Sequence, residues 1–257
     1  MRIEKSATDL HWHTRSGEEP DSSKVNIADL GQRSLENEFL FRHVGSNDRV
    51  LEVGCGNGYL TKELRERVSW VDAFDFSENM VQSAKSLVGQ SNNRFFVESL
   101  LSGRSISQHY DVIVCVRVLI NLKDLEEQCL GVANMAKWLK PGGRLLLVEG
   151  FSDGFGALNQ LRAMCGLAAL KPAVINFYAP LDHLRPVMAQ YFLVESEWHS
   201  GMFDILTRVA YPLLVGAENA IGYSDFHEKI LPLARVVNPD GVERYARLKG
   251  FCLKKSS

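Results

Sequence analysis

The chain has 257 residues, a hydrophobic fraction of 46% and a formal net charge of -2. This length and composition allow one large domain with a substantial buried core, and they argue against disorder along most of the chain. A nearly neutral chain offers no electrostatic reason to expect nucleic acid as a partner, since such binders usually carry a basic stripe.

The sequence also lacks the usual signals of membrane insertion and of disulfide or zinc stabilisation. No apolar run approaches the roughly 20 residues of a membrane span, and the first 24 residues are polar, without the apolar centre of a signal peptide. We therefore expect a cytoplasmic protein with no membrane partner. The five cysteines are scattered and form no C-x-x-C pair, so we expect reduced, mostly buried thiols.

Predicted strands and helices alternate from the N-terminus to Gly150. After a polar arm, apolar residues at helical spacing predict a helix within residues 26–44, with Gly31 as a possible break. The strands predicted next are 49–54, 70–77, 94–99, 110–119 and 144–150. The helices predicted between them are 58–68, 78–88, which Ser77 would cap, and 123–140, which the turn Pro141-Gly142-Gly143 would end.

The pattern changes beyond Gly150. Residues 155–190 are predicted to be helical and loop-rich, residues 204–243 helical or irregular, and residues 191–200 and 247–255 are predicted strands. Strands that alternate with helices favour a parallel sheet covered on both faces. No repeat or low-complexity linker divides the chain, so we predict a single α/β domain over residues 1–257.

Three glycines, Gly54, Gly56 and Gly58, lie where the first predicted strand passes into a helix. Glycine has no Cβ and accepts positive φ, and a helix N-terminus offers unpaired N–H groups, so a ligand can approach the backbone there. In open α/β sheets, ligands bind beyond the carboxyl ends of the strands. The dinucleotide pattern G-x-G-x-x-G is broken, because Tyr59 occupies the position of its third glycine.

Together with Glu52, these glycines form E-x-G-x-G-x-G, which resembles the first motif of class I S-adenosylmethionine-dependent methyltransferases. The resemblance continues in order through residues 50–149 and includes "WLKPGGRLLLVE". It implies a Rossmann-like, doubly wound, mostly parallel seven-stranded sheet. Residues 1–45 would form an arm and helix, residues 46–150 the donor-binding core, and residues 151–257 the acceptor-side lid elements and last strands.

The resemblance also implies which residues bind the methyl donor. Asp75, at the end of the second strand, would bind the ribose hydroxyls, and Phe76 would lie against the adenine. Either Glu98 or Ser99 would contact the adenine amine. Glu52 belongs to the donor motif, but its alternative role is to hydrogen-bond nearby backbone N–H groups and hold the shape of the loop.

Further donor contacts come from outside the glycine turn. The stretch "CVRVLINL" follows the fourth strand, where the family lines the methyl-donor pocket, and it supplies Val116 and Arg117; Met80 is assigned to the same site. A structural ion pair is the alternative role of Arg117. The stretch "RSLENEFLF" resembles an N-terminal helix whose basic residue reaches the methionine carboxylate, which implies this role for Arg33.

The acceptor side is implied by weaker motifs. "R-x-L-I-N-L" resembles a subgroup that methylates sugars and other small biosynthetic intermediates, and two later stretches, "ALNQLRAMCGL" and "INFYAPLDHL", resemble the same subgroup. They imply that Asn159, Arg162 and Asn176 bind the acceptor. Tyr178 and Asn121 are expected to act at the reacting groups.

Methyl transfer requires a donor and an acceptor held in line, and a base can remove the acceptor proton. Histidine suits this role near neutral pH, and we expect His183 first, with His11 and His13 of the arm as alternatives. No carboxylate constellation indicates a metal. We predict that S-adenosylmethionine is the cofactor and that a small molecule, most simply a hydroxyl of a sugar-like intermediate, is the acceptor. Homodimer formation is left open.

Three other functions remain as alternatives. The first is N-methylation of a small molecule. The second is a nicotinamide-dependent oxidoreductase, which Tyr59 disfavours. The third is a non-catalytic S-adenosylmethionine-binding protein, which would keep the glycine turn without an acceptor pocket.

Overall fold

The computed structural model describes residues 29–89, 91–107, 109–220, 222–237 and 239–256. The predicted N-terminal arm, with His11 and His13, lies outside the described residues. No helix in the described parts of the chain is long and apolar enough to cross a membrane.

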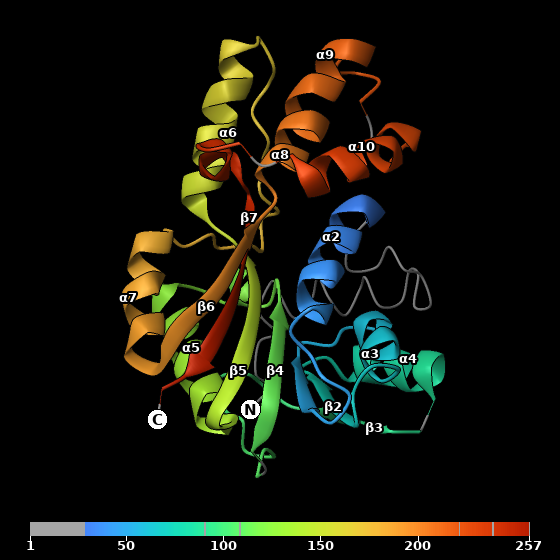
Figure 1. The fold of residues 1–257 in the computed structure, drawn as a ribbon, viewed down its shortest axis with the longest axis vertical. Helices are drawn as coiled ribbons and strands as arrows, with labels where there is room; N and C mark the ends of the chain where they lie inside the picture. The colour runs from blue at the N-terminus through green and yellow to red at the C-terminus, as the bar shows by residue number, and fades with distance from the viewer. Residues whose placement is uncertain (1–28, 90, 108, 221, 238, 257) are drawn as a thin grey trace, which may run out of the picture.

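A seven-stranded sheet forms the centre of the described structure (Figure 1). Its strands are β1 (Arg49–Val53), β2 (Trp70–Asp75), β3 (Asn93–Val97), β4 (Tyr110–Val116), β5 (Leu139–Gly150), β6 (Phe192–His199) and β7 (Leu248–Lys255). The spatial order is β3-β2-β1-β4-β5-β7-β6. The first five strands are parallel, and β7 is antiparallel to both β5 and β6. The predicted α/β, doubly wound, mostly parallel sheet is confirmed.

Both faces of the sheet are covered by helices, and the central strands are therefore apolar on both sides. On one face, Ile113 and Cys115 of β4 pack with residues of α5 (Leu125–Trp138) and α7 (Leu181–Tyr191). On the other face, Val112 and Val114 pack with residues of α2 (Leu30–Phe41), α3 (Tyr59–Leu64) and α4 (Glu78–Val88). Successive side chains of a strand point to opposite faces, so one continuous apolar strand serves both layers.

The lid stands above the carboxyl ends of the strands (Figure 1). It consists of α6 (Ser152–Met164), α8 (Gly201–Ile205), η2 (Leu206–Ala210), α9 (Tyr211–Val215), α10 (Asp225–Val236) and η3 (Val242–Tyr245). The remaining short helix, η1 (Leu119–Asn121), follows β4 at the same edge of the sheet. Helical lid elements were predicted for this part of the chain.

Several details differ from the sequence predictions. Gly31 does not break a helix; it lies in the first turn of α2, and a Cβ there would come within 3.2 Å of the Phe203 ring. Helix α3 ends at Leu64, whereas a helix to residue 68 was expected. Pro141-Gly142-Gly143 lies within β5. The pairing of β5 with β4 shifts between Tyr110 and Val112, so the expected turn is an irregularity within the strand.

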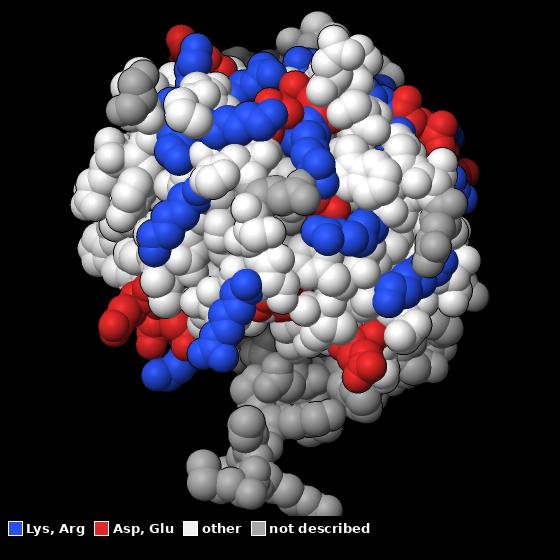
Figure 2. Space-filling view, turned by 90° about the horizontal axis from the view of Figure 1, so that it is seen from below, with Lys and Arg blue, Asp and Glu red and all other residues white. Residues whose placement is uncertain are grey.

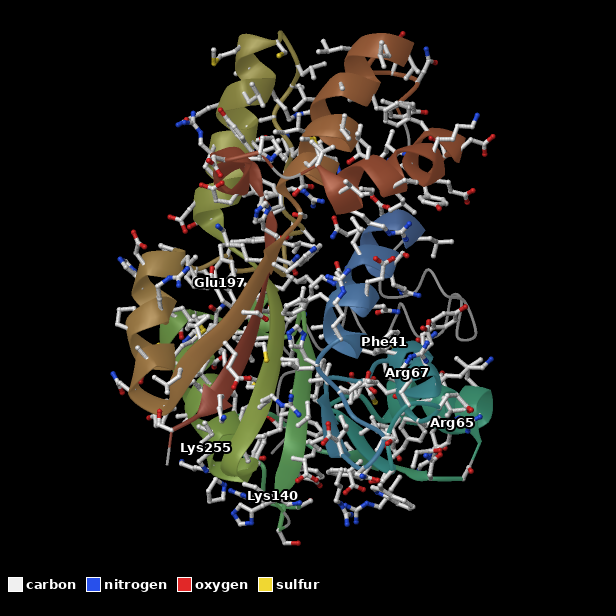
Figure 3. The ribbon with its side chains drawn as sticks, in the orientation of Figure 1. Phe41, Arg65, Arg67, Lys140, Glu197 and Lys255 are labelled. Atoms are coloured by element: carbon white, nitrogen blue, oxygen red, sulfur yellow. The ribbon has the colours of Figure 1, made fainter. Side chains whose placement is uncertain are left out.

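Helix α2 is fixed to the core at its C-terminal end. The Arg67 guanidinium lies 4.0 Å from the centroid of the Phe41 ring, and Figure 3 shows the two side chains next to each other where α2 meets the sheet. At the start of the helix, the Asp29 carboxylate accepts a hydrogen bond from Gln32 N at 3.0 Å, which is an N-cap. Both ends of α2 are therefore held in place on one face of the sheet.

Lys and Arg side chains are spread over the lower face, opposite the lid, with Asp and Glu among them (Figure 2). Several of them form ion pairs: Lys140 with Asp111 at 2.6 Å, Lys254 with Glu195 at 3.5 Å and Arg144 with Asp48 at 3.7 Å. Figure 3 shows Lys140 at this edge. These charges lie away from the carboxyl ends of the strands, where a ligand is expected.

Candidate functional site

A cavity of about 1040 Å³ lies at the carboxyl ends of the parallel strands, beneath the lid. Pockets for small ligands usually measure about 300–1,000 Å³, so this one has room for two ligands side by side. The ends of β1, β2 and β3 line one part of it. The segment after β4, the segment before β7 and the lid line the other part.

The glycine turn lies in the first part. Gly54, Gly56 and Gly58 have positive φ angles of 66°, 52° and 81°, which L side chains rarely adopt. Gly54 and Gly56 line the cavity. Gly58 does not line it, and a Cβ there would come within 2.9 Å of Ala84 and Val88. Gly58 thus permits α4 to pack closely against the glycine turn. The sequence prediction had instead given Gly58 a contact with the donor.

Asp75 and Phe76 lie beside this turn, as predicted. The Asp75 carboxylate is 7% exposed and accepts hydrogen bonds from Gly56 N and Ser77 N, both at 2.9 Å. Each carboxylate oxygen has a second lone pair and can accept another hydrogen bond. Burial raises the pKa of Asp75 to about 6. The Phe76 side chain is 39% exposed and lines the cavity, where it offers a flat apolar face.

Glu98 and Ser99 both line the cavity, but their polar atoms are used within their own loop. The Glu98 carboxylate accepts hydrogen bonds from Ser99 N at 2.8 Å, Ser102 Oγ at 2.7 Å and Ser105 N at 2.6 Å. Burial opposes ionisation, but these hydrogen bonds outweigh it and lower the pKa of Glu98 to about 2. An anionic Glu98 therefore shapes the loop at the end of β3.

Glu52 is almost fully buried at the floor of the cavity. Its Oε2 accepts a hydrogen bond from Thr61 Oγ1 at 2.5 Å. Burial raises the pKa of Glu52 to about 8, and the negative charge of Asp75 adds to this shift. The alternative role predicted for Glu52 used backbone N–H groups, whereas this hydrogen bond comes from a side chain of α3.

A group of polar side chains from α2 lies over the middle of the cavity. The Arg33 guanidinium lies 4.9 Å from the centroid of the Tyr59 ring, and Glu36 Oε2 lies 3.6 Å from Arg117 Nε. Burial, with a smaller effect from Arg117, lowers the pKa of Arg33 to about 10, so this side chain is charged at neutral pH. Arg117 has a left-handed φ of 54°, and it forms the ion pair that was its alternative role.

Several polar atoms of this group are buried and have no hydrogen-bonding partner among the described residues. They are Arg33 Nη1, Glu36 Oε1 and both amide atoms of Gln32. Such atoms are rare in native proteins and call for a partner. Arg33 can donate to a carboxylate and Glu36 can accept from an ammonium group, so the set fits the amino-acid end of S-adenosylmethionine.

Gln32 and Glu36 were not predicted. They occupy i and i+4 on the face of α2 that buries Leu35, Phe39 and Leu40. Polar residues at helical spacing within an apolar stripe indicate a buried polar site, and this signal was present in "QRSLENEFLF". Val116 and Met80 were predicted, and both line the cavity.

Asn121, Asn176 and Tyr178, which were predicted on the acceptor side, all line the cavity. Asn121 Nδ2 donates to Arg117 O at 2.8 Å, while its buried Oδ1 has no donor among the described residues. Asn176 Nδ2 lies 3.5 Å from the Tyr178 hydroxyl. The Tyr178 ring packs over Gly150, where a Cβ would come within 2.3 Å of it.

Gln128 fixes these two segments to each other. Its Nε2 donates to Leu119 O and to Phe177 O, both at 2.9 Å. Glu149 holds the start of the same loop, since its carboxylate accepts hydrogen bonds from Val118 N and Leu119 N at 2.7 Å. Burial raises the pKa of Glu149 to about 8. Neither residue was predicted.

Besides Gly58, three predicted site residues do not line the cavity. The Asn159 side chain exchanges hydrogen bonds with the backbone of Leu170, and Arg162 donates to the backbone of Ala168 and of Arg208. Both therefore hold the lid together. His183 is exposed on α7, which packs on the face of the sheet with α5. The structure does not bring His183 to the cavity, because its helix returns along the flank of the sheet.

No group of three or more His, Cys, Asp or Glu side chains in the described residues is placed to hold a metal ion. Two arginines that were not predicted, Arg208 and Arg247, also line the cavity.

The fold and the cavity define a Rossmann-like α/β domain with a nucleoside-type ligand site at the carboxyl ends of its strands. Residues 50–143 match the family described as "Methyltransferase domain". Malonyl-[acyl-carrier protein] O-methyltransferase of Halalkalibacterium halodurans is 31% identical over 167 residues, which cover 62% of this chain and 56% of that protein. The chain thus spans about half the length of this relative.

Solved structures share the whole fold. The N-methyltransferase NodS of Bradyrhizobium japonicum, in complex with S-adenosyl-L-homocysteine, aligns over 98% of this chain and 99% of its own, with a TM-score of 0.59 and 13% identity. Phosphoethanolamine N-methyltransferase 1 of Haemonchus contortus, in complex with phosphoethanolamine and S-adenosylhomocysteine, aligns over 97% of this chain and 48% of its own. Its TM-score is 0.64, with 15% identity.

Residues 50–143 therefore correspond to a methyltransferase domain, and the described fold is shared with solved methyltransferase structures. This domain match agrees with the predicted methyltransferase class, and the S-adenosyl-L-homocysteine bound by NodS agrees with the predicted cofactor.

Proposed function

We propose that this protein transfers the methyl group of S-adenosylmethionine to a small polar molecule, with an oxygen atom as the acceptor. The observation that carries the proposal is the cavity itself, in which a nucleoside-type site and a separate polar site share one space of about 1040 Å³. A protein that only bound the donor would need no second set of polar groups beside it.

The first part of the cavity supports donor binding. Asp75 would accept hydrogen bonds from the ribose hydroxyls, Phe76 would lie against the adenine, and the glycine turn leaves space for both. Arg33 and Glu36 would hold the carboxylate and the ammonium group of the methionine end. Bound in this way, the donor supplies a methyl group already activated by its sulfonium.

The second part of the cavity supports an acceptor with polar groups. Asn121 Oδ1 lacks a donor among the described residues, and the Tyr178 hydroxyl lies near Asn176. Such groups favour acceptors that satisfy their hydrogen bonds and reject those that leave them unpaired. Because Gln128 and Glu149 fix the two segments, the acceptor would be held in one orientation, which in-line transfer requires. The O-methyltransferase name of the Halalkalibacterium relative supports oxygen as the accepting atom.

Binding and turnover test the proposal separately. Titration calorimetry should show one S-adenosylhomocysteine bound per chain and no binding of NAD⁺. Release of S-adenosylhomocysteine from S-adenosylmethionine should then be followed against a panel of small hydroxyl, carboxyl and amine compounds. Failure to bind S-adenosylhomocysteine would refute the proposal. Methylation of the amine compounds alone would show that the accepting atom is nitrogen and not oxygen.

A further inference from the structure

Arg208 and Arg247 form a pair of cationic side chains at the acceptor part of the cavity. Arg208 and Arg247 together make up the arginine pair. Arg208 comes from η2 in the lid, and Arg247 immediately precedes β7. Both line the same cavity as Tyr178. The Arg247 carbonyl accepts a hydrogen bond from Phe151 N at 3.2 Å, which places Arg247 beside the end of β5.

Each guanidinium is held by one aspartate. Arg208 Nη2 donates to Asp29 Oδ2 at 2.5 Å, which connects the lid to the start of α2. Arg247 Nε donates to Asp204 Oδ1 at 2.7 Å. Asp204 is fully buried and also accepts from the backbone N of Arg247 at 2.8 Å. These contacts fix the orientation of both guanidinium groups before any ligand binds.

The charge of Arg247 acts on Arg208, whereas the pKa of Arg247 itself is raised, because burial opposes its charge but Asp204 outweighs this effect. Burial lowers the pKa of Arg208, and the positive charge of Arg247 is the second cause. The charge of Arg208 likewise lowers the pKa of Arg162, after burial. Asp29 and Asp204 balance part of this charge. Positive charge that lines a cleft raises the local concentration of anions there.

The unused N–H groups of the pair provide the recognition chemistry. A guanidinium carries about five N–H donors in a rigid planar fork, and the hydrogen bonds to the aspartates use one side-chain donor from each arginine. Both side chains are partly exposed, and both line the cavity. Forked N–H groups match the oxygens of a carboxylate or a phosphate, and the charge strengthens each hydrogen bond.

We propose that the arginine pair binds an oxyanion of the acceptor, so that the methylated molecule carries a carboxylate or phosphate group. This inference rests on the proposed methyl transfer and narrows its acceptor from polar molecules in general to anionic ones. Arg33 lies at the methionine end, so the donor carboxylate and the acceptor anion have separate partners.

The test uses the full chain saturated with S-adenosylhomocysteine, so that the donor part is filled. Malonate and inorganic phosphate are titrated as probes at about 0.1 M ionic strength, where charges remain only partly screened. Malonamide, which has the shape of malonate without its charge, is the neutral comparison. We expect saturable binding of at least one anion and none of malonamide. The two anions separate a carboxylate site from a phosphate site.

Three variants assign the binding to the arginine pair. Arg208→Gln and Arg247→Gln should each weaken anion binding at least tenfold, and S-adenosylhomocysteine affinity should not change. Arg235→Gln is the matched control. Arg235 is an exposed residue of α10 that pairs with Glu38 of α2, and it does not line the cavity. Arg247→Gln leaves buried Asp204 without its cation and so can fail to fold. In that case Arg247→Lys is used instead, because lysine keeps the positive charge but lacks the forked N–H groups of the guanidinium.

The outcomes separate this inference from the proposed function. If the parent protein does not bind S-adenosylhomocysteine, the proposed function is wrong. If it binds S-adenosylhomocysteine but neither anion, or if both glutamine variants bind the anion as tightly as the Arg235→Gln control, the anionic acceptor is wrong and methyl transfer stands.

Discussion

The Asp75→Asn variant tests the donor site with the least disturbance of the loop. Asp75 accepts hydrogen bonds from Gly56 N and Ser77 N, so alanine would leave two buried backbone donors unpaired. Each such donor costs about 1–3 kcal/mol, which would mix a folding defect with a binding defect. Asparagine keeps the size of the side chain and one acceptor oxygen, so only one of the two backbone N–H groups loses its acceptor, and it removes the charge.

The expected loss follows from the hydrogen bonds to the ribose. Two hydroxyls that donate to a carboxylate make charge-assisted hydrogen bonds worth about 1.5–3 kcal/mol each, against about 0.5–1.5 kcal/mol for a neutral one. With one oxygen left to accept, we expect a loss of about 1.5–3 kcal/mol. Since about 1.4 kcal/mol corresponds to tenfold, S-adenosylhomocysteine affinity should fall by about ten- to a hundredfold.

Titration calorimetry measures this affinity, and thermal unfolding shows that the variant is folded. Asp111→Asn is the matched control. Asp111 also accepts a backbone hydrogen bond, from Arg49 N at 2.9 Å, and pairs with Lys140, but it lies at the opposite edge of the sheet. Unchanged affinity in folded Asp75→Asn, or an equal loss in Asp111→Asn, would refute the assignment of Asp75 to the ribose.

Three further predictions concern pH and two other donor-side residues. Burial raises the pKa of Asp75 to about 6, so its contribution to stability in the ligand-free protein is present at low pH and is lost as the pH rises through about 6. Donor binding needs the ionised form, so calorimetry should show affinity falling as the pH drops through about 6, and a flat profile in the parent protein would contradict this. Gly54→Ala should abolish donor binding, because its Cβ would lie 2.5 Å from Val118 Cγ2 and would force the turn to shift. The control is Gly142→Ala, which has a similar φ of 71° but open space around it and should bind the donor normally. Equal losses of binding in the two variants would exclude the steric explanation. Arg33→Met should weaken S-adenosylhomocysteine binding about tenfold, as loss of a hydrogen bond to a charged group of about 1.5 kcal/mol implies, without changing adenosine binding; a loss of both would show that Arg33 acts on the fold.

The sheet could be predicted because its signals are local. Residues 110–116 form an apolar run that can only be buried on both faces, and Ser77 caps α4 through Met80 N as expected. The continuation of β5 through Pro141-Gly142-Gly143 was missed because it depends on the pairing with β4, which shifts between Tyr110 and Val112. Registers depend on tertiary contacts, which a local pattern does not contain.

The donor part of the site was predicted better than the acceptor part for the same reason. Gly54, Gly56 and Asp75 lie at the ends of adjacent strands, so their positions follow from the order of the elements. Arg208 and Arg247 are far apart in the sequence and meet only through the packing of the lid. His183 looked favourable because of its place in the sequence, but the direction of α7 carries it to the flank.

The central claim is that the cavity at the carboxyl ends of the strands binds S-adenosylmethionine between the glycine turn and α2. A crystal structure of the complex with S-adenosylhomocysteine tests it most directly. We expect the ribose hydroxyls about 3 Å from the Asp75 carboxylate, the usual hydrogen-bond distance, and the amino-acid end facing Arg33 and Glu36. A ligand bound elsewhere, or one whose ribose does not contact Asp75, would contradict the account.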